Sequence, residues 1–152
     1  MSRDLVFIAQ YVDFIDHFGV AYLSAVAKNV GWTPHFVVFD KRTIEADMRR
    51  IQPSLVCYSA MSTDAPAYLE INRWLKERFS FVSLMGGTHP TYFPEVIEEP
   101  GLDYICRGEG EEAFAEFLQA MADGRDPADV LNISSKTRTN PVRPPVMNLD
   151  DL

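Results

Sequence analysis

The sequence predicts an α/β domain in which helices cover both faces of a parallel five-stranded sheet. Short apolar runs alternate with longer amphipathic runs along most of the chain. Because parallel strands need a crossover between them, this alternation indicates repeated strand–helix units. The 152 residues, of which 47% are hydrophobic, are enough for one compact domain with a buried core.

The first half of the chain predicts three strands and three helices in alternation. Short runs rich in β-branched and aromatic residues indicate strands at 5–9, 35–39 and 55–58. Apolar residues at helical spacing indicate helices over 18–30, 44–51 and 66–79. Gly31 and Pro53 follow the first two helices, where these residue types favour a helix end.

The second half continues the pattern with strands at 81–85 and 103–106. Pro94 opens a short helix, and a longer helix lies between Gly110 and Gly124. Right-handed crossovers between five parallel strands leave few topologies. We expect the doubly wound, flavodoxin-like strand order 2-1-3-4-5.

The chain changes character after Gly124, where helical periodicity ends. Residues 132–140 can form a small hairpin, and three prolines keep the chain extended beyond it. We therefore expect a domain at residues 1–124, followed at 125–152 by a hairpin and a linker toward a second domain.

Composition limits the possible partners and location. The formal net charge is −8 and the pI is about 4.8, which argues against nucleic-acid binding. No apolar run reaches the roughly 20 residues of a membrane span. Cys57 and Cys106 are far apart in the sequence and fit two small buried thiols better than a disulfide scaffold. We expect a cytoplasmic protein.

Small residues follow three consecutive predicted strands: Ser59 with Ser62, then Gly86-Gly87, then Gly108-Glu109-Gly110. Each group alone is explained as an ordinary turn. Sheets of this type bind ligands outside the carboxyl ends of their strands. The joint placement of these residues therefore predicts a ligand at that edge.

Several other binding classes do not fit the residues. Gly108 to Ala113 has the spacing G-x-G-x-x-A, but it follows the last strand and not the first, which argues against a dinucleotide site. Gln10 and Ser59 stand where a response-regulator receiver needs acidic residues. The histidines are isolated, so no metal site is expected. Flavin binding remains possible on the fold alone.

Four segments together resemble a known family. They are the helix 19–26 with the sequence GVAYLSAV, the strand-four sequence GGTHPTYFP at 86–94, the strand-five sequence RGEGE at 107–111, and the proline-containing tail at 140–145 with LDDL at 149–152. In order, they resemble the N-terminal cobalamin-binding domain of cobalamin-dependent radical S-adenosylmethionine enzymes. The resemblance covers nearly the whole chain.

The resemblance implies a corrin at the carboxyl edge of the sheet, with its nucleotide tail running down between the strands. Ser59 and Ser62 would contact the tail or the corrin amides, Gly86-Gly87 would let the tail pass, and Gly108 to Gly110 would flank the base. The full set of implied contacts is Gln10, Tyr11, Val12, Gly19, Ser59, Ala60, Met61, Ser62, Gly86, Gly87, Thr88, His89, Pro90, Gly108, Glu109 and Gly110.

One departure concerns the cobalt ligand. Mutases and methionine synthase use D-x-H-x-x-G, whereas Asp16, His17 and Gly19 form D-H-x-G, which is out of register. We expect no histidine ligand to cobalt and a lower face covered by residues 11–14. His17 is the one candidate that could overturn this expectation.

The resemblance also implies a partner domain. A radical S-adenosylmethionine barrel in the same polypeptide would hold a 4Fe–4S cluster and S-adenosylmethionine. This sequence contains no C-x-x-x-C-x-x-C motif, so we expect it to be non-catalytic alone, as one part of an enzyme such as a methyltransferase. Two alternatives stay open: flavin binding, and a cofactor-free interaction domain whose rim is filled by Met61, Tyr92 and Phe93.

Overall fold

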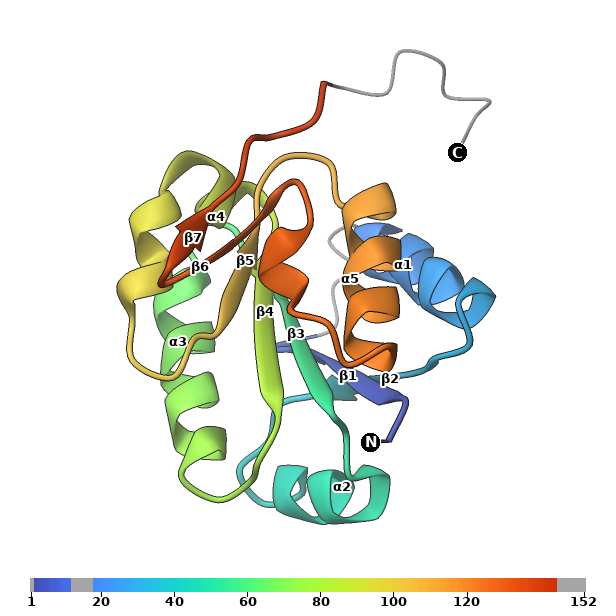
Figure 1. Cartoon of the computed structure of the whole chain (residues 1–152). Coiled ribbons are helices and arrows are strands. Elements are labelled where there is room, and N and C mark those ends of the chain that lie inside the picture. The colour runs from blue at the N-terminus through green and yellow to red at the C-terminus, as the bar shows by residue number, and fades with distance from the viewer. Residues whose placement is uncertain (1, 12–17, 145–152) are drawn as a thin grey trace.

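The computed structural model describes residues 2–11 and 18–144 and contains one mixed sheet with the order β2-β1-β3-β4-β5-β6-β7 (Figure 1). Its strands are β1 Asp4–Ala9, β2 Thr33–Val38, β3 Leu55–Ser59, β4 Val82–Gly86, β5 Tyr104–Cys106, β6 Ile133–Ser135 and β7 Arg138–Thr139. The first five pair in parallel, in the predicted order. The flavodoxin-like α/β fold is confirmed.

Helices connect the parallel strands and cover both faces of the sheet (Figure 1). They are α1 Phe18–Asn29, α2 Ile44–Ile51, α3 Ala65–Lys76, α4 Thr88–Tyr92 and α5 Glu111–Ala122, with short 3-10 helices η1 Pro94–Glu98 and η2 Pro127–Asp129. Helices α1 and α5 lie side by side on one face. Helices α2 and α3 lie on the other.

The alternation of side chains along each strand produces two cores. Leu5 and Phe7 of β1 belong to the core beneath α1 and α5, together with Phe114 of α5. Val6 and Ile8 belong to the core beneath α2 and α3. Because the central strands are buried on both sides, their sequences are continuous apolar runs, which is why the sequence predicts them well.

The edge strand β2 differs from its predicted bounds. It begins at Thr33, two residues before the predicted start, and ends at Val38. Its ladder with β1 begins with Asp4 opposite Thr33, and Pro34 is tolerated there because an edge strand pairs on only one side.

The predicted hairpin at 132–140 is present, but it also extends the sheet. Strand β6 pairs antiparallel with β5, and Ile133 lies opposite Cys106. Two antiparallel strands are therefore added to the five parallel strands that we predicted. The division of the chain at residue 124 stays a prediction. The expectations for Val12, His17, residues 12–14 of the covering loop and the tail 145–152 also stay predictions, because these residues lie outside the described ranges.

Within the described ranges no helix is long and apolar enough to cross a membrane. The cytoplasmic location stays a prediction.

Candidate functional site

Backbone contacts join the loops after β3 and β4 at the carboxyl edge of the sheet. The Ala60 N–H donates to the Gly86 carbonyl oxygen at 2.8 Å, and the His89 N–H donates to the Ala60 carbonyl oxygen at 2.9 Å. Gly87 lies between these contacts with φ of 99°. A Cβ there would lie 2.6 Å from the Ala60 carbonyl oxygen, so this turn requires glycine.

Side chains continue the connection to the loop after β5. The Ser62 hydroxyl lies 3.1 Å from His89 Nδ1. The Thr91 hydroxyl donates to the Gly87 carbonyl oxygen at 2.9 Å and accepts from the Gly108 N–H at 3.0 Å. The three predicted strand ends therefore form one connected structure. We call its loops the carboxyl rim: residues 59–64, 86–93 and 107–110.

A cavity of about 230 Å³ lies below the carboxyl rim, between the sheet and helices α1 and α5. Its walls come from strands β1, β3, β4 and β5, from both helices and from the loop after β5. The lining residues are Phe7, Gly19, Leu23, Cys57, Tyr58, Ser59, Leu84, Gly86, Gly87, Cys106, Gly108, Glu109, Gly110, Glu111 and Phe114.

Glycines keep this cavity open. A Cβ on Gly110 would lie 3.9 Å from Leu23 Cδ2 and from Cys106 Sγ, and a Cβ on Gly86 would lie 3.9 Å from Cys106 Cβ. Methyl groups would fit there, but longer side chains would enter the cavity. A ligand that passes from the rim into the cavity needs small residues at these positions, so the residues present fit such a ligand.

Two thiols face the cavity. Burial raises the pKa of the Cys57 thiol well above its ordinary value, and the neighbouring Cys106 raises it further. Burial also raises the pKa of the Cys106 thiol to about 12, with a smaller effect from Glu111. Both thiols are therefore neutral at physiological pH. With Phe7, Leu84 and Phe114 they give the cavity an uncharged wall, which suits an aromatic ring more than an ion.

Seven of the sixteen predicted contacts line the cavity: Gly19, Ser59, Gly86, Gly87, Gly108, Glu109 and Gly110. Tyr11, Ser59 and Met61 border a smaller hollow beside β1. Gln10 donates from its side-chain amide to the Asp64 carbonyl oxygen at 3.2 Å. Ala60, Ser62, Thr88, His89 and Pro90 lie in the rim, outside the cavity lining. The assignment of these residues as contacts stays a prediction.

The sequence did not single out the apolar wall of the cavity. Its residues, Phe7, Leu23, Cys57, Leu84, Cys106 and Phe114, have the composition of an ordinary core. The available signal was positional, because Cys57 and Cys106 lie within two residues of rim loops on strands separated only by β4.

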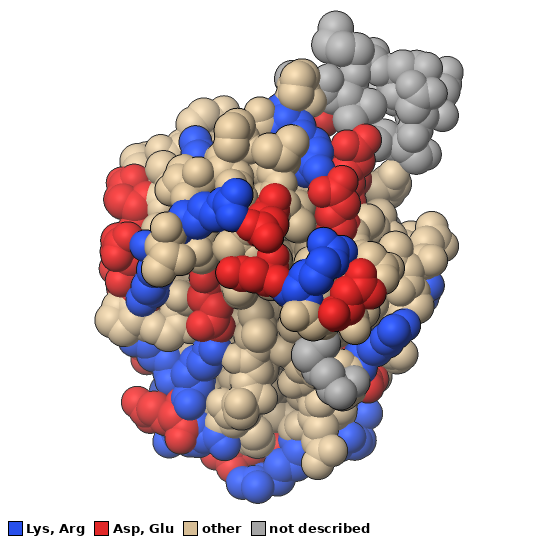
Figure 2. All heavy atoms as spheres, in the orientation of Figure 1, with Lys and Arg blue, Asp and Glu red and all other residues tan. Residues whose placement is uncertain are grey.

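The described histidines lie far apart in the fold. His35 contacts Asp4 at 2.9 Å near the start of β1, whereas His89 lies in the carboxyl rim and stacks on Phe93. Across residues 2–11 and 18–144, no group of three or more His, Cys, Asp or Glu side chains could hold a metal ion. Figure 2 shows acidic and basic side chains interspersed over one face of the molecule.

The fold and the cavity define a ligand-binding α/β domain, and the comparison with protein families identifies its class. The B12 binding domain family matches residues 5–118. The chain belongs to this family, which confirms the family and the cofactor predicted from the sequence.

Relatives of known sequence contain this domain as one part of a longer chain. An uncharacterized methyltransferase, PH0819 from Pyrococcus horikoshii, is 32% identical over 114 residues, which are 69% of this chain and 24% of that protein. The anaerobic magnesium-protoporphyrin IX monomethyl ester cyclase of Rubrivivax gelatinosus is 29% identical over 151 residues, covering 86% of this chain and 27% of the cyclase. The chain thus spans about a quarter of the length of these relatives.

The fold also matches a solved structure. The radical S-adenosylmethionine methyltransferase TsrM from Kitasatospora setae, with cobalamin and a 4Fe–4S cluster bound, superposes with a TM-score of 0.81 and 19% identity. The match covers 97% of this chain and 30% of TsrM. At this identity the match supports the fold.

Proposed function

We propose that this chain holds cobalamin with the corrin over the carboxyl rim and the nucleotide tail in the cavity between α1 and α5. The observation that carries the proposal is that small residues continue from the rim into a cavity with an uncharged wall of Phe7, Cys57, Leu84, Cys106 and Phe114. Bound cobalamin supplies a cobalt centre that can carry a methyl group. The chain's own residues would bind and orient the cofactor, leaving the reaction to the cobalt and to a second domain.

The second domain is part of the same proposal. TsrM is a radical S-adenosylmethionine enzyme and two relatives are a methyltransferase and a cyclase, each several times longer than this chain. We expect a radical S-adenosylmethionine barrel in the same polypeptide, holding the 4Fe–4S cluster and S-adenosylmethionine. In that arrangement the domain described here is not catalytic alone.

The rim favours a cofactor over the cofactor-free alternative. Met61, Tyr92 and Phe93 were the side chains expected to fill the rim of a domain without cofactor. They are instead 42%, 75% and 46% exposed, and none of them lines the cavity. The surface they form suits the apolar edge of a large ring. Membership of the B12 binding domain family also favours cobalamin over flavin.

Retention of the cofactor tests the proposal directly. The purified chain is mixed in separate samples with hydroxocobalamin and with flavin mononucleotide, desalted, and examined by visible spectroscopy. We expect a retained corrin spectrum and no retained flavin. A colourless protein after desalting would contradict the proposal, and a retained flavin alone would support the flavin alternative.

We also propose that no histidine of this chain ligates cobalt. His35 lies at the amino end of the sheet, and His89 has Nδ1 within 3.1 Å of Ser62 and its ring stacked on Phe93. Reduction of the bound cofactor to Co(II) allows a direct test, because a nitrogen ligand splits the electron paramagnetic resonance signal. We expect no splitting of this signal by a histidine imidazole. Splitting that disappears in His17→Ala or His89→Ala, but not in His35→Ala, would contradict this and identify the ligand.

A further inference from the structure

The loop Gly108–Gly110, which lines the cavity, is held from behind by Asn132. This residue is 1% exposed and adopts φ of 70°. Its Nδ2 donates to the Glu109 carbonyl oxygen at 2.8 Å. Its backbone carbonyl accepts from the Arg107 N–H at 2.9 Å. One buried residue therefore fixes both the start and the middle of the loop.

Asn132 also holds the segment that leaves the hairpin. Its Oδ1 accepts from the Arg143 N–H at 2.8 Å, and its own N–H donates to the Pro141 carbonyl oxygen at 3.0 Å. The intervening Val142 packs against the cavity loop, since its Cγ1 lies 2.8 Å from the position of a Cβ on Gly108. The departing segment 141–143 and the cavity loop are thus bound to the same side chain and to each other.

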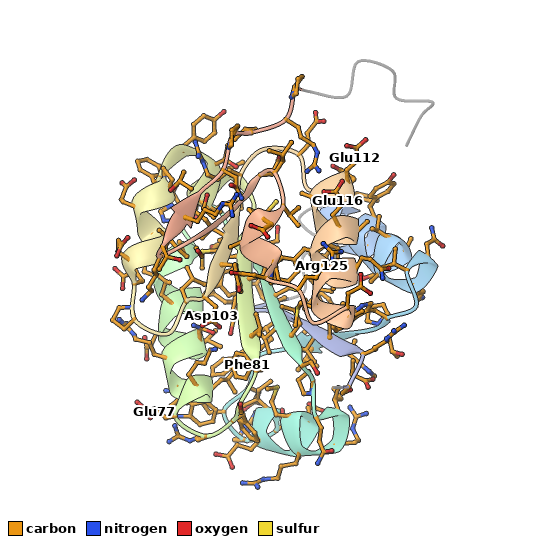
Figure 3. All side chains as sticks on the ribbon, in the orientation of Figure 1. Glu77, Phe81, Asp103, Glu112, Glu116 and Arg125 are labelled. Carbon is orange, nitrogen blue, oxygen red and sulfur yellow. The ribbon has the colours of Figure 1, made fainter. Side chains whose placement is uncertain are left out.

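The Arg143 guanidinium anchors the departing segment to α5. Nη2 lies 2.6 Å from the Glu116 carboxylate, Nε lies 3.5 Å from the Glu112 carboxylate, and Nη1 donates to the Leu131 carbonyl oxygen at 3.0 Å. Figure 3 shows Glu112 and Glu116 at the end of α5 nearest the departing segment. The Arg143 side chain is only 17% exposed, so these ion pairs are better protected from solvent than most surface pairs.

We propose that Asn132 is a positioning residue that couples the departing segment 141–143 to the cofactor cavity. This inference rests on the proposed binding of cobalamin in the cavity. Coupling between two sites is reciprocal, so bound cobalamin holds the segment in place, and displacement of the segment loosens cobalamin. Movement of whatever follows the segment in the polypeptide would then reach the cofactor through Asn132 and through the packing of Val142 on Gly108.

Two variants of the 152-residue chain test the coupling. Asn132→Gly keeps the left-handed backbone, because glycine adopts positive φ freely, and removes the buried side chain with its two hydrogen bonds. Arg143→Ala removes the anchor to α5 and leaves Asn132 intact. Arg125→Ala is the matched control, because it removes an exposed ion pair with Asp123 at the opposite end of α5.

The measurements are the dissociation constant for hydroxocobalamin and the hydrogen exchange of the Arg143 amide, with and without cobalamin. In the unsubstituted chain we expect cobalamin to slow exchange at Arg143. For Asn132→Gly we expect about tenfold weaker binding, comparable to the loss of a net hydrogen bond, and an Arg143 amide that no longer responds to cobalamin. Arg143→Ala should weaken binding less, and Arg125→Ala should leave both readouts unchanged.

The outcomes separate this inference from the proposed function. If the unsubstituted chain binds no cobalamin, the proposed function fails and the coupling to cobalamin fails with it. In that case exchange at Gly108 without cofactor still reports whether Asn132 holds the loop. If the unsubstituted chain binds cobalamin but Asn132→Gly and Arg143→Ala both bind it equally well, the inference is wrong and the proposed function stands. If Asn132→Gly does not fold, Arg143→Ala alone decides by the same criterion.

Discussion

Gly87 shows how one backbone position holds two loops together. Its positive φ and the 2.6 Å approach of Ala60 to its missing Cβ leave no room for a side chain. Gly87 also has ψ of −170°, a combination with φ of 99° that is essentially restricted to glycine. Gly124 has φ of 69° and no atom within 4 Å of the corresponding Cβ position, so it is a glycine with positive φ and no collision.

We expect Gly87→Ala to lower the free energy of unfolding by about 3 kcal/mol, because conformational strain and a collision with backbone atoms add together. Gly124→Ala should cost about 1 kcal/mol, from the conformation alone. Urea unfolding of the two variants measures both values. Equal losses of unfolding free energy in the two variants would show that the loop after β3 moves away from residue 87 freely. The loops after β3 and β4 would then not be held together as described.

The Cys106 thiol predicts a pH dependence of stability. Its pKa is about 12 in the folded chain against an ordinary value of 9.0. Below pH 9 the thiol is neutral in both states and stability is unaffected. Between pH 9 and 12 the unfolded state binds fewer protons, so the free energy of unfolding falls as pH rises, by up to about 1.4 kcal/mol per pH unit for one thiol.

Urea unfolding at pH 8, 9 and 10 checks this dependence. The unsubstituted chain should lose more stability above pH 9 than Cys106→Ala, which lacks the thiol. The Cys57 thiol and the Tyr58 and Tyr104 hydroxyls, whose pKa values are also raised mainly by burial, contribute to the remaining dependence in both proteins. The same loss in both proteins would contradict the burial of Cys106 in a neutral wall.

At the scale of elements, the C-terminal hairpin depends on Asn140. This buried residue donates from Nδ2 to the carbonyl oxygens of Ala128, Val130 and Ile133, at 2.5, 2.8 and 3.0 Å. These oxygens belong to η2, to the residue after it and to β6. One side chain therefore joins the elements that extend the sheet beyond β5.

We expect Asn140→Ala to destabilise the chain by about 2 kcal/mol, because buried carbonyl groups lose their donor. The loss should be concentrated in the hairpin, where hydrogen exchange at β6 would rise more than exchange at β1. Gln119→Ala, at an exposed position of α5, is the control and should change neither quantity appreciably. A uniform rise across β1 and β6 would indicate that the hairpin is not a separable unit.

The elements differ in how far the sequence predicts them. Strands β1 and β3 are nearly continuous apolar runs, and β4 is apolar apart from the buried Ser83, because both faces are buried, so their places in the sheet follow from the pattern. The hairpin was expected, but its addition to the sheet was not, because Ile133-Ser134-Ser135 is too short and polar to indicate a sheet partner. The rim glycines were predicted together with the strands, because each pair of glycines follows closely on a strand that the apolar pattern identifies.

The cavity wall was not predicted, and the reason is physical. A phenylalanine or thiol that borders a cavity has the same sequence environment as one packed in a core. Phe7, for instance, is 3% exposed and is a member of the core beneath α1 and α5, yet it also lines the cavity. Only the arrangement of α1 beside α5 reveals which of these residues border open space.

In the molecule as a whole, the proposed binding mode divides a large cofactor between the carboxyl rim and the cavity. The rim would present the exposed side chains of Met61, Tyr92 and Phe93 to a broad ring, while the cavity, with its uncharged wall, would hold a tail. The segment leaving the hairpin contacts the loop between these two parts. This arrangement suits the proposed role of the chain as a carrier of the cofactor.

The proposed binding mode places the nucleotide tail of cobalamin in the cavity between α1 and α5. The most direct measurement is a spectroscopic titration with hydroxocobalamin that compares Gly110→Leu with Gln119→Leu. Gly110 has a negative φ of −99°, so leucine is compatible with the backbone there but fills the space beside Leu23 and Cys106. Gln119 lies on the exposed side of α5, the helix that Gly110 precedes.

We predict that Gly110→Leu raises the dissociation constant at least about tenfold, since the tail must then displace a side chain, whereas Gln119→Leu leaves it unchanged. Thermal unfolding of both variants verifies that they are folded. Unaltered binding by a folded Gly110→Leu would contradict this placement of the tail and indicate that the tail lies at another part of the carboxyl rim.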